Sequence, residues 1–265
     1  MTEPPPPPPP LRPQPGRAAL RLATFNVQHG RMAAGRVDVG VLVRTCAALG
    51  ADVLGLQEVD VGTHRVGGSD LAGEAAATTG MAVAFGPTRP LGPGRYGNAL
   101  LARGELQDVE LLSLPPSEPP LPFKASKPFR TRNEARGAIL ASVVLARGWR
   151  LSVAVCHLGL APGEAGTQLG AVLASLVERP APLVLLGDLN LPPGPVHALV
   201  EAAGLTLVGG PPTFPGHQPS QRIDHIAVAD LVPTGVVAPA VPVSDHRPLV
   251  VEVEVPQGDE RSRPW

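Results

Sequence analysis

The sequence contains only two cysteines, Cys46 and Cys156, and each lies in an apolar segment. Two isolated cysteines do not make a disulfide framework, so we expect both to be small core residues in a reducing compartment. No apolar run approaches the roughly 20 residues that cross a membrane, and the N-terminus has prolines where a signal peptide has its apolar segment. The sequence therefore predicts a cytoplasmic protein with no transmembrane segment, and we expect a monomer.

Aromatic residues and lysines are also scarce. Only 3% of the residues are aromatic, so the 43% that are hydrophobic predict a core packed mainly from aliphatic side chains. The chain has two lysines and a net charge of -1. Because tight nucleic-acid binding depends on many phosphate contacts, this balance argues against a processive or tightly DNA-bound nuclease.

Several catalytic signatures are absent from the sequence. It has no cysteine or histidine cluster with zinc spacing, no Gly-x-Ser-x-Gly elbow, no Walker loop and no dinucleotide fingerprint. Any chemistry must therefore come from residues that are far apart in the sequence.

The ends of the chain differ in composition from its middle. Residues 1–19 contain nine prolines, seven of them consecutive, which is typical of a polyproline II segment with no means of packing. We expect a disordered tail over residues 1–19, one α/β domain over residues 20–256, and a flexible tail over residues 257–265. No internal repeat or linker interrupts the middle segment.

Short apolar segments and amphipathic segments alternate along this domain. The pattern predicts helices at residues 37–49, 71–79, 164–177 and 196–203. It predicts strands at residues 20–25, 52–56, 81–85, 98–102, 106–112, 138–145, 150–156, 183–186, 222–228 and 248–255. A long proline-rich loop covers residues 113–134, and loops of this length are usually functional or disordered.

Polar side chains follow many of the predicted strands. The clearest case is the apolar run 183–186, which Gly187 ends and which Asp188 and Asn190 follow. Alone, this pattern is also typical of a polar turn after a core strand. Its recurrence favours a site at one edge of the sheets, formed by Asn26, Glu58, His157, Asp188, Asn190, Asp224, Asp245 and His246.

These residue types suit one kind of chemistry. Carboxylates with open coordination positions are what Mg²⁺ prefers, because it keeps waters and accepts substrate phosphates as ligands. Metal-assisted attack of water on a phosphoester also needs an imidazole and neutral donors for the phosphate. Asp224 and His225 are adjacent on a predicted strand, so only one of them can face this edge. His29, His64, His197 and His217 match no motif, and we expect them on the surface or in loops.

Eight short motifs occur in one order along residues 20–250. They are Thr-Phe-Asn26, Leu-Gln-Glu58-Val, Tyr96-Gly-Asn98-Ala-Leu-Leu, Ala-Arg136-Gly, His157-Leu, Gly-Asp188-Leu-Asn190, Ile-Asp224-His225-Ile and Ser-Asp245-His246-Arg-Pro. In these motifs the chain resembles the endonuclease/exonuclease/phosphatase superfamily of metal-dependent phosphohydrolases.

The resemblance implies a four-layer α/β sandwich, with two mixed β-sheets face to face and flanked by helices. It implies Mg²⁺, with Mn²⁺ as a substitute, held by Asn26, Glu58 and Asp245. It also implies that Asp224 rather than His225 faces the edge and orients His246, that Asp188 orients the attacking water, and that Asn190 binds the phosphate. His157 would bind the phosphate or protonate the leaving oxygen. Asn98 and Arg136 resemble substrate phosphate-binding residues.

The expected activity is hydrolysis of a phosphodiester or phosphomonoester, and the substrate stays open. The motifs are compatible with a phosphorylated small molecule, a lipid headgroup or a nucleic acid as the substrate. They are also compatible with a non-catalytic binding protein that retains the fold. A nuclease acting on DNA or RNA is the main alternative. We expect the loop 113–136 to select the substrate, because it carries Lys124, Lys127, Arg130, Arg132 and Arg136 against two acidic residues.

Overall fold

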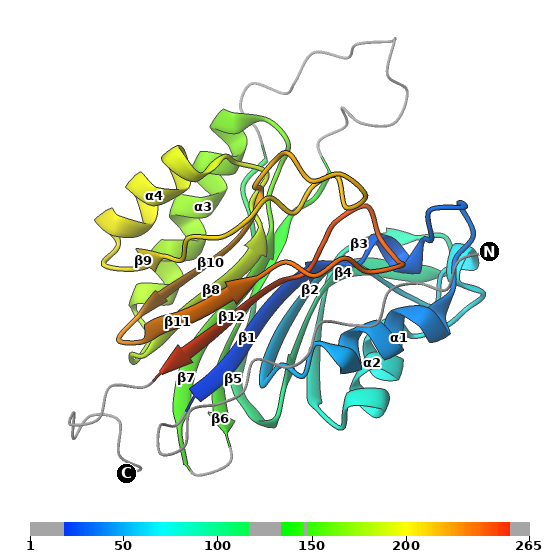
Figure 1. The fold of residues 1–265 in the computed structure, drawn as a ribbon, viewed down its shortest axis with the longest axis horizontal. Coiled ribbons are helices and arrows are strands. Elements are labelled where there is room, and N and C mark those ends of the chain that lie inside the picture. Colours follow the sequence, from blue (N-terminus) through cyan, green and yellow to red (C-terminus); the bar gives the residue numbers. More distant parts are fainter. Residues whose placement is uncertain (1–18, 117–133, 146–147, 255–265) are drawn as a thin grey trace.

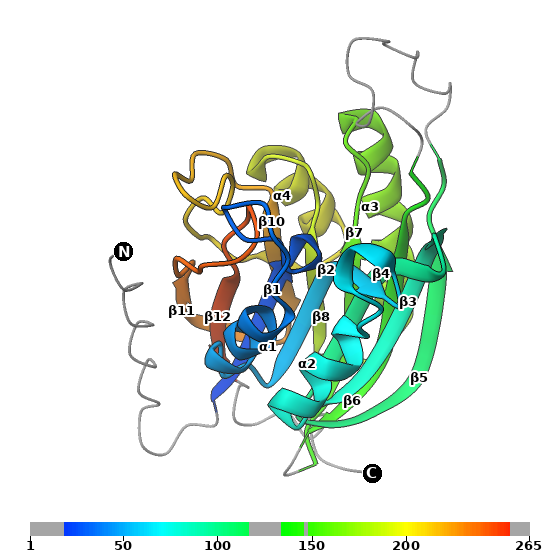
Figure 2. The same ribbon diagram turned by 90° about the vertical axis from the view of Figure 1, so that its right-hand side faces the viewer.

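The computed structural model describes residues 19–116, 134–145 and 148–254. Residues 1–18, the expected C-terminal tail and most of the basic loop, including Lys124, Lys127, Arg130 and Arg132, lie outside the described residues. Ala19 was expected in the N-terminal tail, but it begins the first strand. Two six-stranded β-sheets pack face to face, and helices cover both outer faces (Figure 1). Figure 2, turned by 90°, shows the same layers from the side. The predicted four-layer α/β sandwich is therefore confirmed.

The first sheet has the strand order β11-β12-β1-β2-β4-β3. Its only parallel pair is β1 with β2, and every other neighbour is antiparallel. The helices α1 (Val39–Ala48) and α2 (Leu71–Thr79) cover its outer face. The strands are β1 (Ala19–Asn26), β2 (Val53–Val61), β3 (Ala82–Leu91), β4 (Gly94–Ala102), β11 (Val232–Val237) and β12 (Leu249–Glu254).

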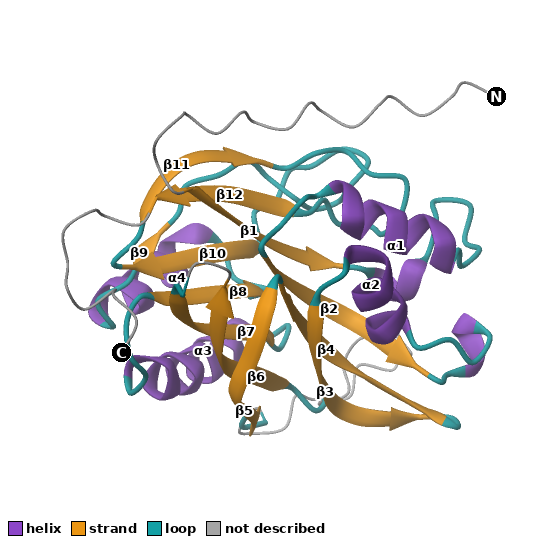
Figure 3. Ribbon diagram, turned by 90° about the horizontal axis from the view of Figure 1, so that it is seen from below, coloured by secondary structure: helices purple, strands orange, loops and turns teal. Residues whose placement is uncertain are grey.

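The second sheet has the strand order β5-β6-β7-β8-β10-β9, with β7 and β8 as its parallel pair. The helices α3 (Pro162–Val177) and α4 (Pro193–Ala202) cover its outer face, as the view in Figure 3 also shows. The strands are β5 (Gly104–Ser113), β6 (Gly137–Leu145), β7 (Arg150–His157), β8 (Leu183–Asp188), β9 (Thr206–Leu207) and β10 (Asp224–Ala229).

Alternating side chains explain how one chain builds these layers. Along β1, Leu22 faces the second sheet and Ala23 faces α1, so each face of the strand is buried in a different apolar cluster. The amino ends of α1 and α2 are fixed by aspartates: Asp38 accepts a hydrogen bond from the Val41 N–H, and Asp70 from the Gly73 N–H. Such caps stabilise a helix by about 1 kcal/mol each.

Both cysteines are buried, Cys46 in α1 and Cys156 in β7, which confirms their prediction as core residues. None of the described helices is both long and apolar enough to cross a membrane.

The structure corrects the predicted end of one strand. Glu58 was expected after the strand end, but β2 continues through it to Val61. The register with β4 shifts between Leu56 and Val59, and Glu58 has a φ of 58°, so the residue sits in a β-bulge. A bulge re-aims a side chain within a strand, which an apolar pattern does not reveal.

Other strand boundaries also differ from the prediction. Asn98 was expected to begin a strand, yet β4 begins at Gly94, and β10 begins at Asp224 rather than at residue 222. Strands β9 and β11 were not predicted. β9 has two residues, and β11 contains Pro233 and is largely exposed at a sheet edge, so neither has the alternating apolar pattern.

Gly55 should be required because the two sheets are in close contact at this position. A Cβ there would lie 3.0–3.1 Å from side-chain atoms of Val155 and Leu186. We expect Gly55→Val to lower the free energy of unfolding by about 1–3 kcal/mol through overpacking. Chemical denaturation measures the change.

Gly170 of α3 is the matched control, because a Cβ there meets no atom within 4 Å. Gly170→Ala should stabilise the protein by about 0.5–1 kcal/mol, since alanine is the better helix former. If Gly55→Val were neutral, the two sheets would not be in tight contact at this point.

Candidate active site

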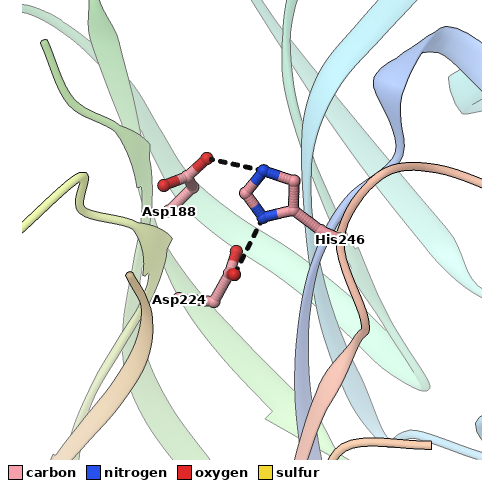
Figure 4. Close-up of side chains that lie close together, drawn as sticks. All are labelled: Asp188, Asp224 and His246. Atoms are coloured by element: carbon pink, nitrogen blue, oxygen red, sulfur yellow. Dashed lines mark hydrogen bonds and ion pairs between the residues drawn. The ribbon is translucent and has the colours of Figure 1, made fainter. Parts of the chain in front are cut away.

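The candidate site lies where the ends of four central strands meet. In the second sheet, Asp188 at the end of β8 stands opposite Asp224 at the start of β10 and beside His157 at the end of β7. In the first sheet, Asn26 ends β1. Figure 4 shows His246 reaching the two aspartates from the segment that precedes β12. These residues from both sheets therefore lie together at one edge of the sandwich, which we call the rim.

The first part of the site is a buried pair of His246 and Asp224. The Nδ1 of His246 lies 2.9 Å from Asp224 Oδ2, and both side chains are buried. Thr213 donates a hydrogen bond of 2.5 Å to the same carboxylate oxygen, and Phe214 packs against the imidazole with ring centroids 4.8 Å apart. The ring is therefore held in one orientation, with Nε2 turned toward Asp188.

Asp188 is the centre of the second part. Its Oδ2 accepts a hydrogen bond of 2.9 Å from Asn26 Nδ2. The same oxygen lies 3.5 Å from His157 Nε2 and 3.8 Å from His246 Nε2. Three side chains from three different elements therefore converge on a single carboxylate oxygen.

The bulged Glu58 joins this group through Asn26. The amide nitrogen of Asn26 also donates to Glu58 Oε1 at 3.1 Å, while its Oδ1 accepts from the Gln28 N–H. Burial raises the pKa of Glu58, and the negative charge of Asp245 adds to this effect. A carboxylate with a raised pKa next to other acids is stabilised by a nearby cation.

Burial likewise raises the pKa of Asp188, and the neighbouring Asp224 carboxylate adds to the increase. Burial alone would lower the pKa of His246, but the carboxylates of Asp224 and Asp188 outweigh it and raise that pKa. The raised pKa keeps a proton on His246, so the imidazole pairs with Asp224. Such opposed shifts are typical of functional sites.

His157 is held in one tautomer by Arg136. The Nη1 of Arg136 lies 3.0 Å from His157 Nδ1. A guanidinium can only donate, so Nδ1 must accept and the ring proton must be on Nε2, which faces Asp188. Burial and the charge of Arg136 keep the pKa of His157 well below its usual value. His157 is therefore a neutral hydrogen-bond donor at this rim.

The two remaining amides differ in how they are used. Asn190 has a φ of 50°, donates from its backbone N–H to Asp188 Oδ1 at 3.2 Å, and binds the Leu158 carbonyl through its side chain. Asn98 lies inside β4, where its side chain donates to the Gly137 carbonyl of the other sheet at 2.9 Å. Asn98 thus joins the two sheets just below the rim.

The structure places Asp224 at the rim and its neighbour His225 away from it. Asp224 binds His246, whereas His225 points away and contacts the Leu191 carbonyl through Nε2 at 2.8 Å. Among the histidines without a motif, His64, His197 and His217 are exposed as expected. His29 differs, because it is half-buried in the short helical turn at Gln28–Gly30.

Two site residues were missed by the sequence reasoning. Thr213 supports Asp224, and Ser244 connects the His246 segment to β1 through a bond of 2.6 Å to the Asn26 carbonyl. Ser244 also accepts from the His246 N–H at 3.1 Å and has a φ of 75°. Its position in the Ser-Asp-His motif was a usable signal, but Thr213 lies in a proline-rich loop with none.

The site could hold a metal ion. Ligand atoms of Asp188, Asp224 and His246 lie within 4.8 Å of one another. Glu58 and Asp188 provide a second set, since both carboxylates bind the single nitrogen of Asn26. Carboxylate oxygens are ligands that hard divalent cations prefer, so the two carboxylates fit such an ion.

The family model described as the endonuclease/exonuclease/phosphatase family matches residues 23–246. The chain belongs to this family. No curated protein matches the sequence.

Solved structures share the fold at low sequence identity. An endonuclease/exonuclease/phosphatase from Beutenbergia cavernae superposes with a TM-score of 0.69 at 19% identity, covering 90% of this chain and 72% of that one. The human nocturnin catalytic domain gives 0.64 at 20% identity, covering 89% and 94%. ANGEL2, a 2′,3′-cyclic phosphatase, gives 0.65 at 13% identity, covering 91% and 96%.

His225 should make stability depend on pH. Burial lowers its pKa to about 4 from 6.5, so between these values the unfolded chain binds a proton that the folded protein does not. The stabilisation from the neutral ring is complete above pH 6.5 and is lost as the pH falls toward 4, by up to about 3 kcal/mol. We expect the free energy of unfolding of His225→Gln to fall less than that of the wild type over this range.

The comparison with the variant is needed because Asp188 and Glu58, whose pKa values are raised, change stability in the opposite direction over this pH range. Denaturation curves at pH 7 and pH 4.5 give both free energies. Parallel pH profiles for the two proteins would mean that His225 takes up a proton in the folded state.

Proposed function

We propose that the protein is a metal-dependent hydrolase of phosphoesters. The observation that carries the proposal is the convergence of Asn26, His157 and His246 on one oxygen of Asp188. A carboxylate surrounded by donors can orient a water molecule beside a phosphate group, because the same donors can bind the phosphate oxygens. Membership of the endonuclease/exonuclease/phosphatase family supports the same reaction class.

Asp188 is the residue that orients and deprotonates the attacking water. Its raised pKa makes it a better proton acceptor than an ordinary aspartate. The water oxygen forms a bond to phosphorus as the ester P–O bond breaks, and the water proton goes to Asp188. The leaving oxygen departs with the bonding electron pair and takes a proton from solvent. Asp224 keeps His246 charged and oriented, so His246 Nε2–H stabilises the negative charge that develops on the phosphate.

His157 and Asn190 bind the phosphate in this proposal. His157 offers Nε2–H, because Arg136 occupies Nδ1. With that proton arrangement His157 serves as a donor to the phosphate and not as the acid for the leaving oxygen. Asn190 is held beside Asp188 by its own backbone N–H.

Glu58 is the main metal-binding residue of the proposal, with Asp245 and Asn26 beside it. Asp224 and His246 are less suited, because each already has the other as a hydrogen-bond partner. When bound, Mg²⁺ or Mn²⁺ would supply positive charge to polarise a phosphate oxygen. The charge would also offset the repulsion between Glu58 and Asp245, which contributes to the raised pKa of Glu58.

Removal of the Glu58 charge should reduce activity and metal dependence together. We expect Glu58→Gln to lower the rate of bis-p-nitrophenyl phosphate hydrolysis roughly 100-fold or more, because a neutral amide holds a divalent cation poorly. Rates are measured against Mg²⁺ and Mn²⁺ concentration after chelation. Glu74→Gln is the matched control, since Glu74 is exposed on α2. Full turnover by the wild type in excess chelator would refute the metal dependence.

Asp188 and His246 should act as one unit. Asp188→Asn and His246→Gln should each lower kcat by roughly 10³-fold or more, and the double variant should lose little beyond either single one. His197→Gln, an exposed change on α4, serves as the control. Losses that multiply in the double variant would show that the two residues act independently.

A further inference from the structure

The rim continues beyond the catalytic cluster along β4. Leu100 of this strand faces the second sheet, so the alternation of side chains places Asn98 and then Tyr96 on the same face. Asn98 confirms this direction by its bond to Gly137 of β6. Tyr96 therefore lies on the face of β4 that carries Asn98, one step further from Leu100.

Two arginine side chains contact the ring of Tyr96. The guanidinium carbon of Arg89, its neighbour on β3, lies 4.7 Å from the centre of the ring, and that of Arg65 lies 5.7 Å from it. Cations attract the face of an aromatic ring, so the Tyr96 ring helps to hold each guanidinium in place. About a third of each arginine side chain is exposed: 33% for Arg89 and 37% for Arg65.

Each of these two guanidiniums also donates hydrogen bonds to a carboxylate. Asp60 is fully buried and accepts from Arg65 Nε at 2.6 Å and Nη2 at 2.7 Å. Glu134 accepts from Arg89 Nε at 2.8 Å and pairs with Arg136 Nη2 at 3.0 Å. Within the described ranges, Arg65 Nη1 and both Nη groups of Arg89 have no hydrogen-bond partner, so their N–H groups remain for a ligand.

This arrangement is continuous with the catalytic cluster. Arg136 pairs with Glu134 through Nη2 and contacts His157 through Nη1, and His157 faces Asp188. Three guanidiniums therefore face two carboxylates, Asp60 and Glu134. Arg65 neutralises the buried Asp60, and Arg136 fixes the tautomer of His157. Glu134 also pairs with Arg136, so it has a cationic partner besides Arg89. Arg89 therefore shares Glu134 with Arg136.

We propose that Arg89 and Arg65, held on Tyr96, bind a second phosphate group of the substrate, next to the phosphate that is hydrolysed. This inference rests on the proposed function, since it assigns the reacting phosphate to the Asp188 rim. A guanidinium with free N–H groups binds phosphate oxygens through charge-assisted hydrogen bonds. The substrate class is a molecule with two neighbouring phosphates, such as a nucleotide strand or a polyphosphorylated small molecule.

The first test uses ligands that cannot be hydrolysed, so it does not depend on turnover. Propane-1,3-bisphosphonate and propylphosphonate differ by one phosphonate group, and calorimetric titration with Mg²⁺ present gives both affinities. We expect the wild type to bind the bisphosphonate about tenfold more tightly or better. Arg89→Gln should reduce this ratio to near one, and Arg65→Lys, which keeps a charge beside Asp60, should reduce it in part.

Arg150→Gln is the matched control. It removes the same charge from an exposed arginine at the opposite end of β7 from His157, and the ratio should stay at the wild-type value. Equal affinities of the wild type for the two ligands, or an equal loss in Arg150→Gln, would overturn the proposal.

Competition identifies the source of the second phosphate. Thymidine 3′,5′-bisphosphate and inositol 1,4-bisphosphate are each titrated against the bound bisphosphonate, with thymidine 5′-monophosphate and inositol 1-phosphate as references. Stronger displacement by either bisphosphate than by its monophosphate supports the subsite. It assigns the second phosphate to a nucleotide or to an inositol phosphate. Displacement by neither would overturn it. A wild type that binds the bisphosphonate selectively but hydrolyses no phosphoester would refute the proposed function alone.

Discussion

The hydrogen bond from Asn26 to Asp188 joins the two sheets at the point where the site opens. Asn26 ends a strand of the first sheet and Asp188 ends a strand of the second, and both side chains are buried. Without this contact, the buried carboxylate of Asp188 and the half-buried carboxylate of Glu58 would lose the donor that they share. An unpaired buried charge is expensive, so the packing of the sheets and the electrostatics of the site depend on the same amide.

The backbone around this amide is held in uncommon conformations. Gln28, Glu58, Asn190 and Ser244 all have a positive φ, and each lies beside a catalytic or metal-binding candidate. Such residues cost of order 1–3 kcal/mol each and persist only where the surroundings fix them. Here the fixing contacts are the Asn26 side chain for Gln28 and Glu58, the Asp188 carboxylate for Asn190, and the Asn26 carbonyl for Ser244. Local strain is thus coupled to the placement of the site.

Features that depend on local sequence pattern could be predicted from the sequence. Features that depend on tertiary contacts could not. The apolar run of β8 placed Asp188 at a strand end, and alternation with the family motif selected Asp224 over His225. The bulge at Glu58 was not predictable, because its cause is a register shift against β4. Thr213 was missed for a similar reason, since its role follows only from the loop that brings it to Asp224. Edge strand β11 was missed because an exposed strand has little apolar alternation.

The central claim is that Asp188 directs a water molecule at phosphorus. Hydrolysis of bis-p-nitrophenyl phosphate in ¹⁸O-labelled water, followed by mass spectrometry of both products, tests it most directly. The account predicts one ¹⁸O atom in p-nitrophenyl phosphate, none in p-nitrophenol, and no labelled product above background from Asp188→Asn. Label in p-nitrophenol, or an undiminished yield of labelled phosphate from Asp188→Asn, would contradict it.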